Sequence, residues 1–309
     1  MAVTIYDIAA TVGVSASTVS RALRGDPGVA APTAERIRQC AGELEYIPNA
    51  SARSLLAGCS KLFGLLLPSL THQVELEPGI NLSKLAGNAG FDLMITLYHQ
   101  QSDVYERMLE RLIMLRVDGI FVLPPQFESH SSMVERLVRR RTPLVFIDRT
   151  PLESDGATVT VEADNITGAR QLGEAALEIG ADARISCFGS INSVTRAREE
   201  GFAPFLRAPG PESKKIFIAG DHPEPVRQKA GELRRLFPGA RFSAGVFDAW
   251  NADEDNFEEI FVIPQDFAAM TAKAFDTMLN MISGSGTTKF SRLTVPALPL
   301  LQFKRRSAG

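Results

Sequence analysis

Through residues 62–248 the sequence alternates short apolar runs with longer amphipathic stretches. Continuous apolar runs bounded by turn residues predict strands buried on both faces, as in a parallel sheet. The amphipathic stretches predict helices that cover such a sheet. The apolar runs occupy residues 62–68, 91–97, 119–124, 143–148, 157–162, 183–189, 215–220 and 242–248. The helical stretches lie near residues 74–89, 103–116, 129–141, 165–179, 196–206 and 224–236.

The apolar runs form two groups of four, which predicts two similar α/β halves. A chain of 309 residues is too long for one ordinary core, so we expect two or three domains. No segment approaches the roughly 20 apolar residues that span a bilayer. The N-terminus lacks the basic run, apolar core and cleavage site of a signal peptide. We therefore expect a cytoplasmic protein with no membrane partner.

Residues that would carry catalysis or bind a metal are sparse. The three cysteines are widely spaced and form no CxxC pair, so we expect neither a disulfide nor a metal site: Cys40, Cys59 and Cys187. The four histidines have no ligand-like spacing: His72, His99, His130 and His222. The sequence contains no P-loop, HExxH, GxSxG or GxGxxG motif. We expect no enzyme, no catalytic residue and no cofactor.

The first 48 residues have the pattern of a small three-helix domain. Thr4 followed by Asp7 is a capping box, and Gly13 ends the short helix that begins there. Ser15 then caps a second helix, residues 16–24. Two short helices joined by a tight turn predict a helix-turn-helix, whose second helix enters the major groove of DNA. A third helix is predicted over residues 32–44.

The outward face of the second helix is small and polar, with one arginine. Arg21 has a planar guanidinium that can bind guanine with two hydrogen bonds or bind a phosphate. Ser17 is able to bind a base edge or a phosphate, and the alternative for this face is simple solvation. Residues 1–61 hold six Lys/Arg and five Asp/Glu, so the DNA-binding prediction rests on motif geometry and not on charge.

Two motifs in this order, VTIYDIAATVGVSASTVSRAL and YIPNASARSLLAG, resemble the DNA-binding head and hinge of the LacI/GalR family of transcription regulators. The resemblance implies that the segment after Pro48-Asn49 forms a hinge helix on DNA. It also implies that Leu55, with Ala52 one turn earlier, inserts into a minor-groove base step. The alternative for Leu55 is packing against the body. The DNA-binding residues expected on this resemblance are Thr4, Ile5, Ser15, Ala16, Ser17, Ser20, Arg21, Asn49, Ala52 and Leu55.

The body also resembles that family, through ADNITGARQLGEAALEIG, TRAREEGF and PQDFAAMTAKAFDTMLNMISG. The implied fold is a periplasmic-binding-protein-like α/β body of two parallel-sheet subdomains behind the all-α head. The expected organisation is a helix-turn-helix domain at 1–48, a hinge at 49–60 and an effector-binding and dimerisation domain at 61–309. Within the body we expect an N-subdomain of about 61–150 and 265–290, and a C-subdomain of about 151–264 and 291–305.

The same resemblance implies an effector site between the subdomains, since ligands bind at the carboxyl ends of strands in such sheets. Asp148 matches a ligand-contacting aspartate, and Gln265 matches a lining position at the crossing between the halves. Arg196, five residues before Gly201, matches the effector arginine. Asp248 corresponds to the acid at the end of either of two family strands. These groups suit a sugar or another small polar metabolite. The alternatives are a helix cap or pairing with Arg149 for Asp148, and a surface charge for Arg196.

One departure from the family pattern concerns residues 251–259. Only NADEDNFEE separates AGVFDAW (residues 244–250) from the next apolar run, where the family has a further helix and strand. Two function hypotheses stay open as a result. The first is a repressor that binds a pseudo-palindromic operator as a homodimer and responds to a sugar-like effector. The second is a DNA-binding regulator with a truncated body that no longer senses a small molecule. A solute-binding protein would fit the body alone, but not the head.

Overall fold

A computed structural model describes residues 3–47, 59–71, 73–125, 131–150, 158–189, 192–248, 250, 256–284 and 291–304. The chain divides into two compact units, Met1–Ser60 and Lys61–Gly309. No helix among the described residues is long and apolar enough to cross a membrane.

The first unit contains the three predicted helices, α1 (Ile5–Val12), α2 (Ala16–Leu23) and α3 (Ala31–Glu43). Their inward faces form one small core that includes Ile8, Val19 and Ile37, each of which is fully buried. The order of helices and the tight turn between α1 and α2 confirm the predicted helix-turn-helix. Val19 and Ala22 of α2 pack in this core with residues of α1 and α3. These contacts fix the orientation of α2 and leave its opposite side exposed.

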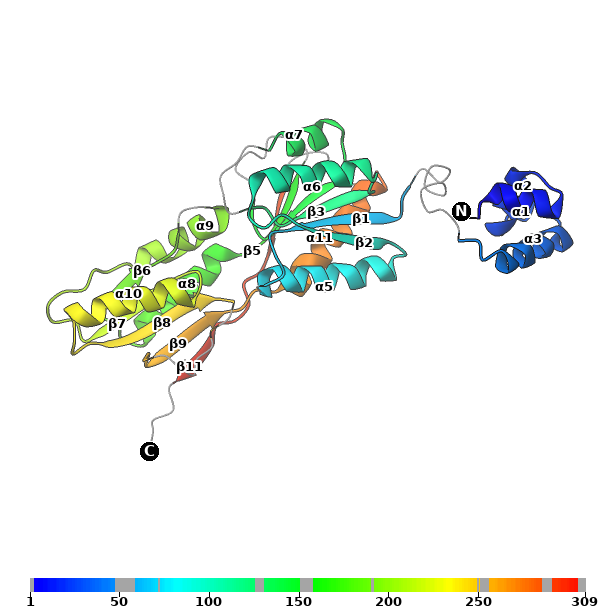
Figure 1. The fold of residues 1–309 in the computed structure, drawn as a ribbon. Helices are drawn as coiled ribbons and strands as arrows, with labels where there is room; N and C mark the ends of the chain where they lie inside the picture. The colour runs from blue at the N-terminus through cyan, green and yellow to red at the C-terminus, as the bar shows by residue number, and fades with distance from the viewer. Residues whose placement is uncertain are drawn as a thin grey trace. The chain divides into compact units, whose positions relative to one another are not determined.

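The second unit contains two sheets, each covered by helices (Figure 1). The first sheet has the strand order β10-β5-β4-β3-β1-β2, and all of its strand pairs are parallel. Its strands are β1 (Leu62–Leu67), β2 (Asp92–Leu97), β3 (Gly119–Val122), β4 (Leu144–Ile147), β5 (Val159–Ala163) and β10 (Ser291–Val295). Its covering helices are α5 (Gln73–Asn88), α6 (Ser102–Met114), α7 (Ser132–Arg139) and α11 (Phe267–Ile282).

Helices α5 and α11 cover one face of the first sheet, and α6 and α7 cover the other (Figure 1). Two separate apolar clusters result, one on each face. Phe63 and Phe121 of the strands pack with Phe275 of α11 in the first cluster. Tyr98 and Tyr105 belong to the second. Burial on both faces explains why the strands are continuous apolar runs.

The second sheet has the strand order β11-β9-β8-β7-β6. Strands β6 to β9 are parallel, and β11 pairs with β9 in the antiparallel sense. The strands are β6 (Ala183–Ser186), β7 (Lys215–Ala219), β8 (Arg241–Phe247), β9 (Glu259–Ile263) and β11 (Leu301–Lys304). The helices of this subdomain are α8 (Asn165–Glu178), α9 (Ser193–Phe202), α10 (Pro223–Leu236) and a short 3-10 helix, η1 (Ala203–Phe205).

The boundaries between the two subdomains differ from those expected. Residues 151–264 and 291–305 were assigned to the C-subdomain, but β5 and β10 both lie in the first sheet. The reason is pairing: β5 lies between β4 and β10, with Phe146 opposite Thr160 and Arg292 opposite Thr160 on its other side. The chain therefore enters the second sheet after β5 and forms β6 to β9 there. It then returns to the first subdomain for α11 and β10, and only β11 lies again in the second sheet. An apolar run in the sequence carries no information about which strand it pairs with.

The two sheets are linked by two similar strand–helix modules. In the first, β4 is followed by Asp148, ten further residues, β5 and then α8, which packs in the second subdomain. In the second, β8 is followed by Asp248, ten further residues, β9 and then α11, which packs in the first subdomain. The short segment after β8 therefore matches the length of its counterpart after β4. Its described residues Trp250 and Phe257 pack edge to face, at 5.4 Å between ring centroids.

Candidate functional site

Helix α2 presents the face that was predicted to bind DNA. Ser17 and Arg21 are exposed, Ser20 is half-buried, and Val19 and Ala22 are buried in the head core. The spacing of Ser17, Ser20 and Arg21 places them along one side of the helix. The outward orientation of this face is confirmed.

Several predicted contact residues also hold the head together. Ser15 caps α2, since its Oγ accepts a hydrogen bond from the Thr18 amide at 3.1 Å. Asp7 accepts hydrogen bonds from the backbone amide and the hydroxyl of Thr4, both at 2.8 Å. Ile5 and Ala16 are half-buried and pack against the head core. The predicted hinge contacts lie outside the described residues: Asn49, Ala52 and Leu55.

Arg21 has a partner that sequence analysis missed. Its Nε lies 2.8 Å from Asp26 Oδ2, and its Nη2 lies 3.3 Å from Asp26 Oδ1. The backbone amide of Gly28 donates to the same Oδ1 at 2.8 Å. The hydrogen bond from Arg21, followed by that from Gly28, lowers the pKa of Asp26 to about 2. The carboxylate therefore stays ionised at any working pH, and Arg21 is held by the loop that follows its own helix.

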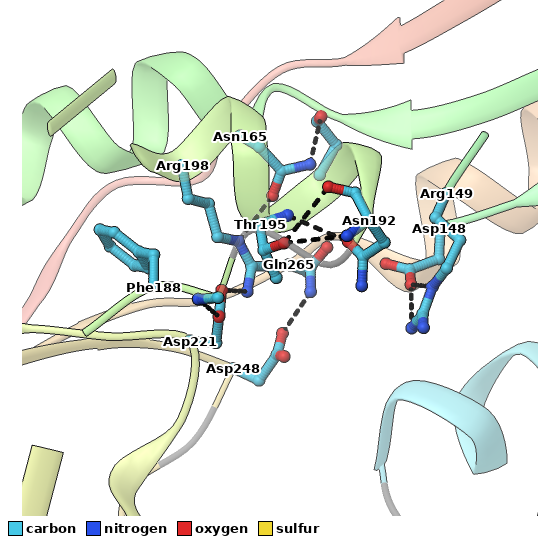
Figure 2. Close-up of polar contacts among 12 residues, drawn as sticks. Asp148, Arg149, Asn165, Phe188, Asn192, Thr195, Arg198, Asp221, Asp248 and Gln265 are labelled. Carbon is cyan, nitrogen blue, oxygen red and sulfur yellow. Dashed lines mark hydrogen bonds and ion pairs between the residues drawn. The ribbon is translucent and has the colours of Figure 1, made fainter. Parts of the chain in front are cut away.

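In the body, Asp148, Asp248 and Gln265 lie just after the carboxyl ends of strands β4, β8 and β9 (Figure 2). Asp148 follows β4 and Asp248 follows β8, with φ of +77° and +69°. Each amide donates to the neighbouring strand, Asp148 to the Val161 carbonyl and Asp248 to the Ile263 carbonyl, both at 2.9 Å. Left-handed φ is uncommon for a non-glycine residue, so the same backbone turn is held in place at both positions.

Asp248 and Gln265, both expected to line the effector site, contact each other. Gln265 Nε2 donates to Asp248 Oδ1 at 2.6 Å, and Gln265 Oε1 is buried without a hydrogen-bond partner among the described residues. Burial raises the pKa of Asp248 to about 6, although Arg198 and the Gln265 hydrogen bond act in the opposite direction. This pair thus presents two oxygen acceptors, one of them ionised at neutral pH.

Asp148 is only 2% exposed and is paired with its neighbour in sequence. Arg149 Nη2 lies 2.7 Å and Nε 2.9 Å from Asp148 Oδ2. This is the alternative that the sequence left open for Asp148. The carboxylate charge is therefore balanced within the first subdomain.

Asp148, Asp221, Asp248 and Gln265 form what we call the body cluster (Figure 2). Arg196 does not lie in this cluster. It is exposed on α9, and its Nε donates to the Asn192 carbonyl at 3.3 Å. Arg198, two residues later, is 4% exposed and lies in the cluster (Figure 2). Two residues advance about 200° around a helix, so the two arginines face opposite ways. Sequence analysis missed Arg198. The signal that could have indicated it is the four-residue spacing of Val194, Arg198 and Phe202, which are buried on one side of α9.

Arg198 makes three contacts that fix its guanidinium. Its Nε donates to Asn165 Oδ1 at 2.9 Å, and its Nη1 lies 3.1 Å from Asp221 Oδ1. Its Cζ lies 3.7 Å from the centroid of the Phe247 ring. Asp221 Oδ2 accepts a further hydrogen bond from the Gly189 amide at 3.1 Å. Helices α8 and α9 and strands β7 and β8 therefore meet at one buried ion pair.

A second polar group joins the subdomains directly. The Thr150 amide, after β4, donates to Ser193 Oγ at the start of α9, at 2.9 Å. Both hydroxyls donate to Glu162 of β5, which is 5% exposed. Burial raises the pKa of Glu162, and the Thr150 hydrogen bond and Arg292 partly offset that increase. Sequence analysis missed this group, because its members are ordinary residues far apart in the chain.

Comparison with known proteins identifies the head by sequence and the body by fold. The family model described as "Bacterial regulatory proteins, lacI family" matches residues 4–49. The chain is 32% identical to the Sucrose operon repressor of Klebsiella pneumoniae over 173 residues, which are 55% of this chain and 50% of that protein. It is 27% identical to the Sucrose operon repressor of Lactococcus lactis subsp. lactis over 288 residues, covering 92% of this chain and 83% of that protein. The first match thus spans only half of the relative's length.

Among solved structures, the chain resembles the Lac repressor dimer bound to operator and the anti-inducer ONPF. The TM-score is 0.74 at 18% identity, covering 97% of this chain and 98% of that one. A likeness at this identity establishes the fold, and it confirms the predicted class of an all-α head with a periplasmic-binding-protein-like α/β body. Residues 4–49 are therefore a helix-turn-helix domain of the lacI family of bacterial regulatory proteins, joined in this chain to a body with the Lac repressor fold.

Proposed function

We propose that this protein is a cytoplasmic, sequence-specific transcription regulator that represses its target genes and carries out no enzymatic step. The observation that carries the proposal is the lacI-family match at residues 4–49, with the polar face of α2 directed outward. The protein acts as a homodimer on a pseudo-palindromic operator, since a two-fold protein reads two half-sites. The second helix of each head lies in the major groove, and Leu55 of each hinge enters the minor groove between them.

The proposed effector is a small polar molecule rich in hydroxyl groups. The oxygens Asp248 Oδ and Gln265 Oε1 are buried or partly buried acceptors. A ligand with hydroxyl groups can donate hydrogen bonds to both. A sugar supplies several hydroxyl donors, and the two relatives compared above are sucrose operon repressors by name. An effector changes operator affinity only if it binds the DNA-bound and free states with different affinity. The hydrogen bond from the Thr150 amide to Ser193 Oγ joins the two subdomains, so a change in their relative position would break or strain it.

The second candidate is a regulator whose body no longer senses a small molecule. The observation in its favour is internal charge pairing: Asp148 is bound to Arg149 and Asp221 to Arg198. These pairs satisfy two of the carboxylates without a ligand.

A thermal-shift screen separates the two candidates. Purified protein is heated with neutral sugars, sugar phosphates and nucleobases, because a ligand that binds the folded state raises Tm by mass action. We expect a shift with a neutral, hydroxyl-rich compound that is lost in Asp248→Asn and kept in Arg196→Ala. Absence of any shift across the library favours the second candidate. Equal loss in both variants would count against the assignment of the site to Asp248.

A further inference from the structure

We propose that Asp26 and Gly28 form a seat that positions Arg21 to read guanine, so that this loop sets the base specificity of the head. The inference rests on the proposed DNA-binding function and adds to it a residue-level determinant of specificity. Arg21 is the one arginine on the outward face of α2, and its side chain is 45% exposed.

The pairing occupies one particular edge of the guanidinium. Asp26 contacts Nε and Nη2, which together form the side of the fork nearest the aliphatic stem. A guanidinium has five N–H donors, and the Asp26 contacts leave unused the end of the fork, formed by Nη1 and the second proton of Nη2; within the described part of the chain no other partner of Arg21 occupies it. Guanine presents two adjacent acceptors, O6 and N7, in the major groove. The free end of the fork matches this pair.

Holding the arginine has a consequence for specificity. A free arginine side chain spreads over many rotamers and binds phosphates, which carry no sequence information. A seated one is pre-organised for a single two-bond contact. The ionised Asp26 also disfavours any arrangement in which this edge of the head approaches a phosphate closely, because the two negative charges repel.

Gly28 completes the seat by leaving room for the guanidinium. A Cβ at this position would lie 2.2 Å from Arg21 Nη2 and 3.1 Å from Asp26 Oδ1. Because Nη2 is the far end of a flexible side chain, an added methyl group displaces the arginine and leaves the fold intact. Gly28→Ala therefore disturbs the position of Arg21 without removing any charge, whereas Asp26→Asn weakens the hold on Arg21 by removing the charge.

The head supplies a matched control. Arg38 Nη1 lies 3.0 Å from Glu35 Oε2 on α3, and both side chains are exposed. Glu35→Gln removes an exposed acid from an arginine pair of the same head, but away from α2.

The experiment selects DNA with the full-length protein from a pool of duplexes with a randomised centre. Wild type, Asp26→Asn, Gly28→Ala, Arg21→Lys and Glu35→Gln are compared by sequencing the bound fraction. We expect wild type and Glu35→Gln to select guanine at one position of each half-site. The other three variants should lose that preference by about tenfold, the range of one good two-bond contact. Preferences elsewhere should persist, and affinity for poly(dA-dT) should not fall.

Two results would overturn the inference. One is the same guanine preference in Asp26→Asn and Gly28→Ala as in wild type. The other is a loss at every position together with a lower Tm in both variants, which would assign the loop a folding role. A wild type that selects no sequence at all would overturn the proposed function itself, and the inference with it.

Discussion

At the scale of single residues, the body cluster is defined by which carboxylates have a cationic partner. Asp148 and Asp221 each contact an arginine, at 2.7 and 3.1 Å. The hydrogen-bond partner of Asp248 is the neutral amide of Gln265. A buried carboxylate without an adjacent cation is harder to ionise. Burial accordingly raises the pKa of Asp248 to about 6, which predicts a pH-dependent contribution to stability.

Asp248→Asn should change stability in a pH-dependent way. The pKa of Asp248 is about 6 in the folded protein, above its ordinary value of 3.8, so the folded state binds more protons between these values. Its favourable contribution is fully present below pH 4 and is lost as pH rises through 6. Asparagine keeps the hydrogen bond from Gln265 without the charge. We expect the variant to gain about 1–3 kcal/mol over wild type at pH 7, relative to pH 4. Tm measured from pH 4 to 8 tests this, and a difference independent of pH would contradict it.

Arg198→Ala should be far more damaging than Arg196→Ala. Removal of the Arg198 guanidinium leaves Asp221 buried without its cation, which costs about 3–5 kcal/mol. Arg196 is exposed, so its replacement should change the unfolding free energy by no more than about 0.5 kcal/mol. Urea denaturation of both variants provides the measurement. Similar losses of unfolding free energy in the two variants would contradict the assignment of Arg198 to the buried side of α9 and of Arg196 to the exposed side.

At the scale of elements, helix α9 packs closely against α8 in the second subdomain. A Cβ at Gly201 would lie 2.4 Å from the Ile166 carbonyl oxygen and 3.0 Å from Ala169 Cβ. Backbone atoms do not move aside as a flexible side chain does. The absence of a side chain at Gly201 therefore sets the approach of the two helices, and through it the position of Arg198.

Gly201→Ala should lower the free energy of unfolding by about 1–3 kcal/mol through overpacking. Gly231→Ala on α10 is the matched control, because a Cβ there meets no heavy atom within 4 Å. In a helix interior that replacement should stabilise the protein by up to about 1 kcal/mol. Chemical denaturation compares the two. A neutral result at Gly201 would show that α9 is free to shift away from α8.

At the scale of the whole molecule, the proposed function requires the two compact units, Met1–Ser60 and Lys61–Gly309, to act together. The body contains two modules of strand, aspartate, strand and helix, and each helix packs in the opposite subdomain. This exchange ties Asp148 and Asp248 to the relative position of the two sheets. The proposed route from that position to DNA is the segment that links the head to the body.

Leu55→Ala should weaken binding to the selected operator and reduce DNA bending, while leaving binding to random duplex nearly unchanged. An apolar side chain that enters a base step costs a few kcal/mol of unstacking, offset by the wider contact that the bend permits. Gel mobility of permuted operator fragments measures the bend angle. Equal bending by variant and wild type would argue that Leu55 packs on the body instead.

Local patterns determined much of this protein. The three head helices follow from caps, a glycine turn and apolar spacing, and they agree with the structure to within about two residues. The body strands could be predicted from continuous apolar runs, because a strand buried on both faces is apolar throughout, whichever strand it pairs with. Asp248 and Gln265 were found because the resemblance to a known family supplied their positions.

Only the tertiary structure decided the rest. Strand pairing is non-local, so the places of β5 and β10 in the first sheet were hidden in the sequence. The choice between Arg196 and Arg198 depended on the phase of α9 against α8, and the partner of Arg21 depended on how one loop folds back on α2. In each case the deciding contact joins residues whose own sequence neighbourhoods are ordinary. Propensity and periodicity are properties of a segment, whereas a pairing is a property of two segments in space.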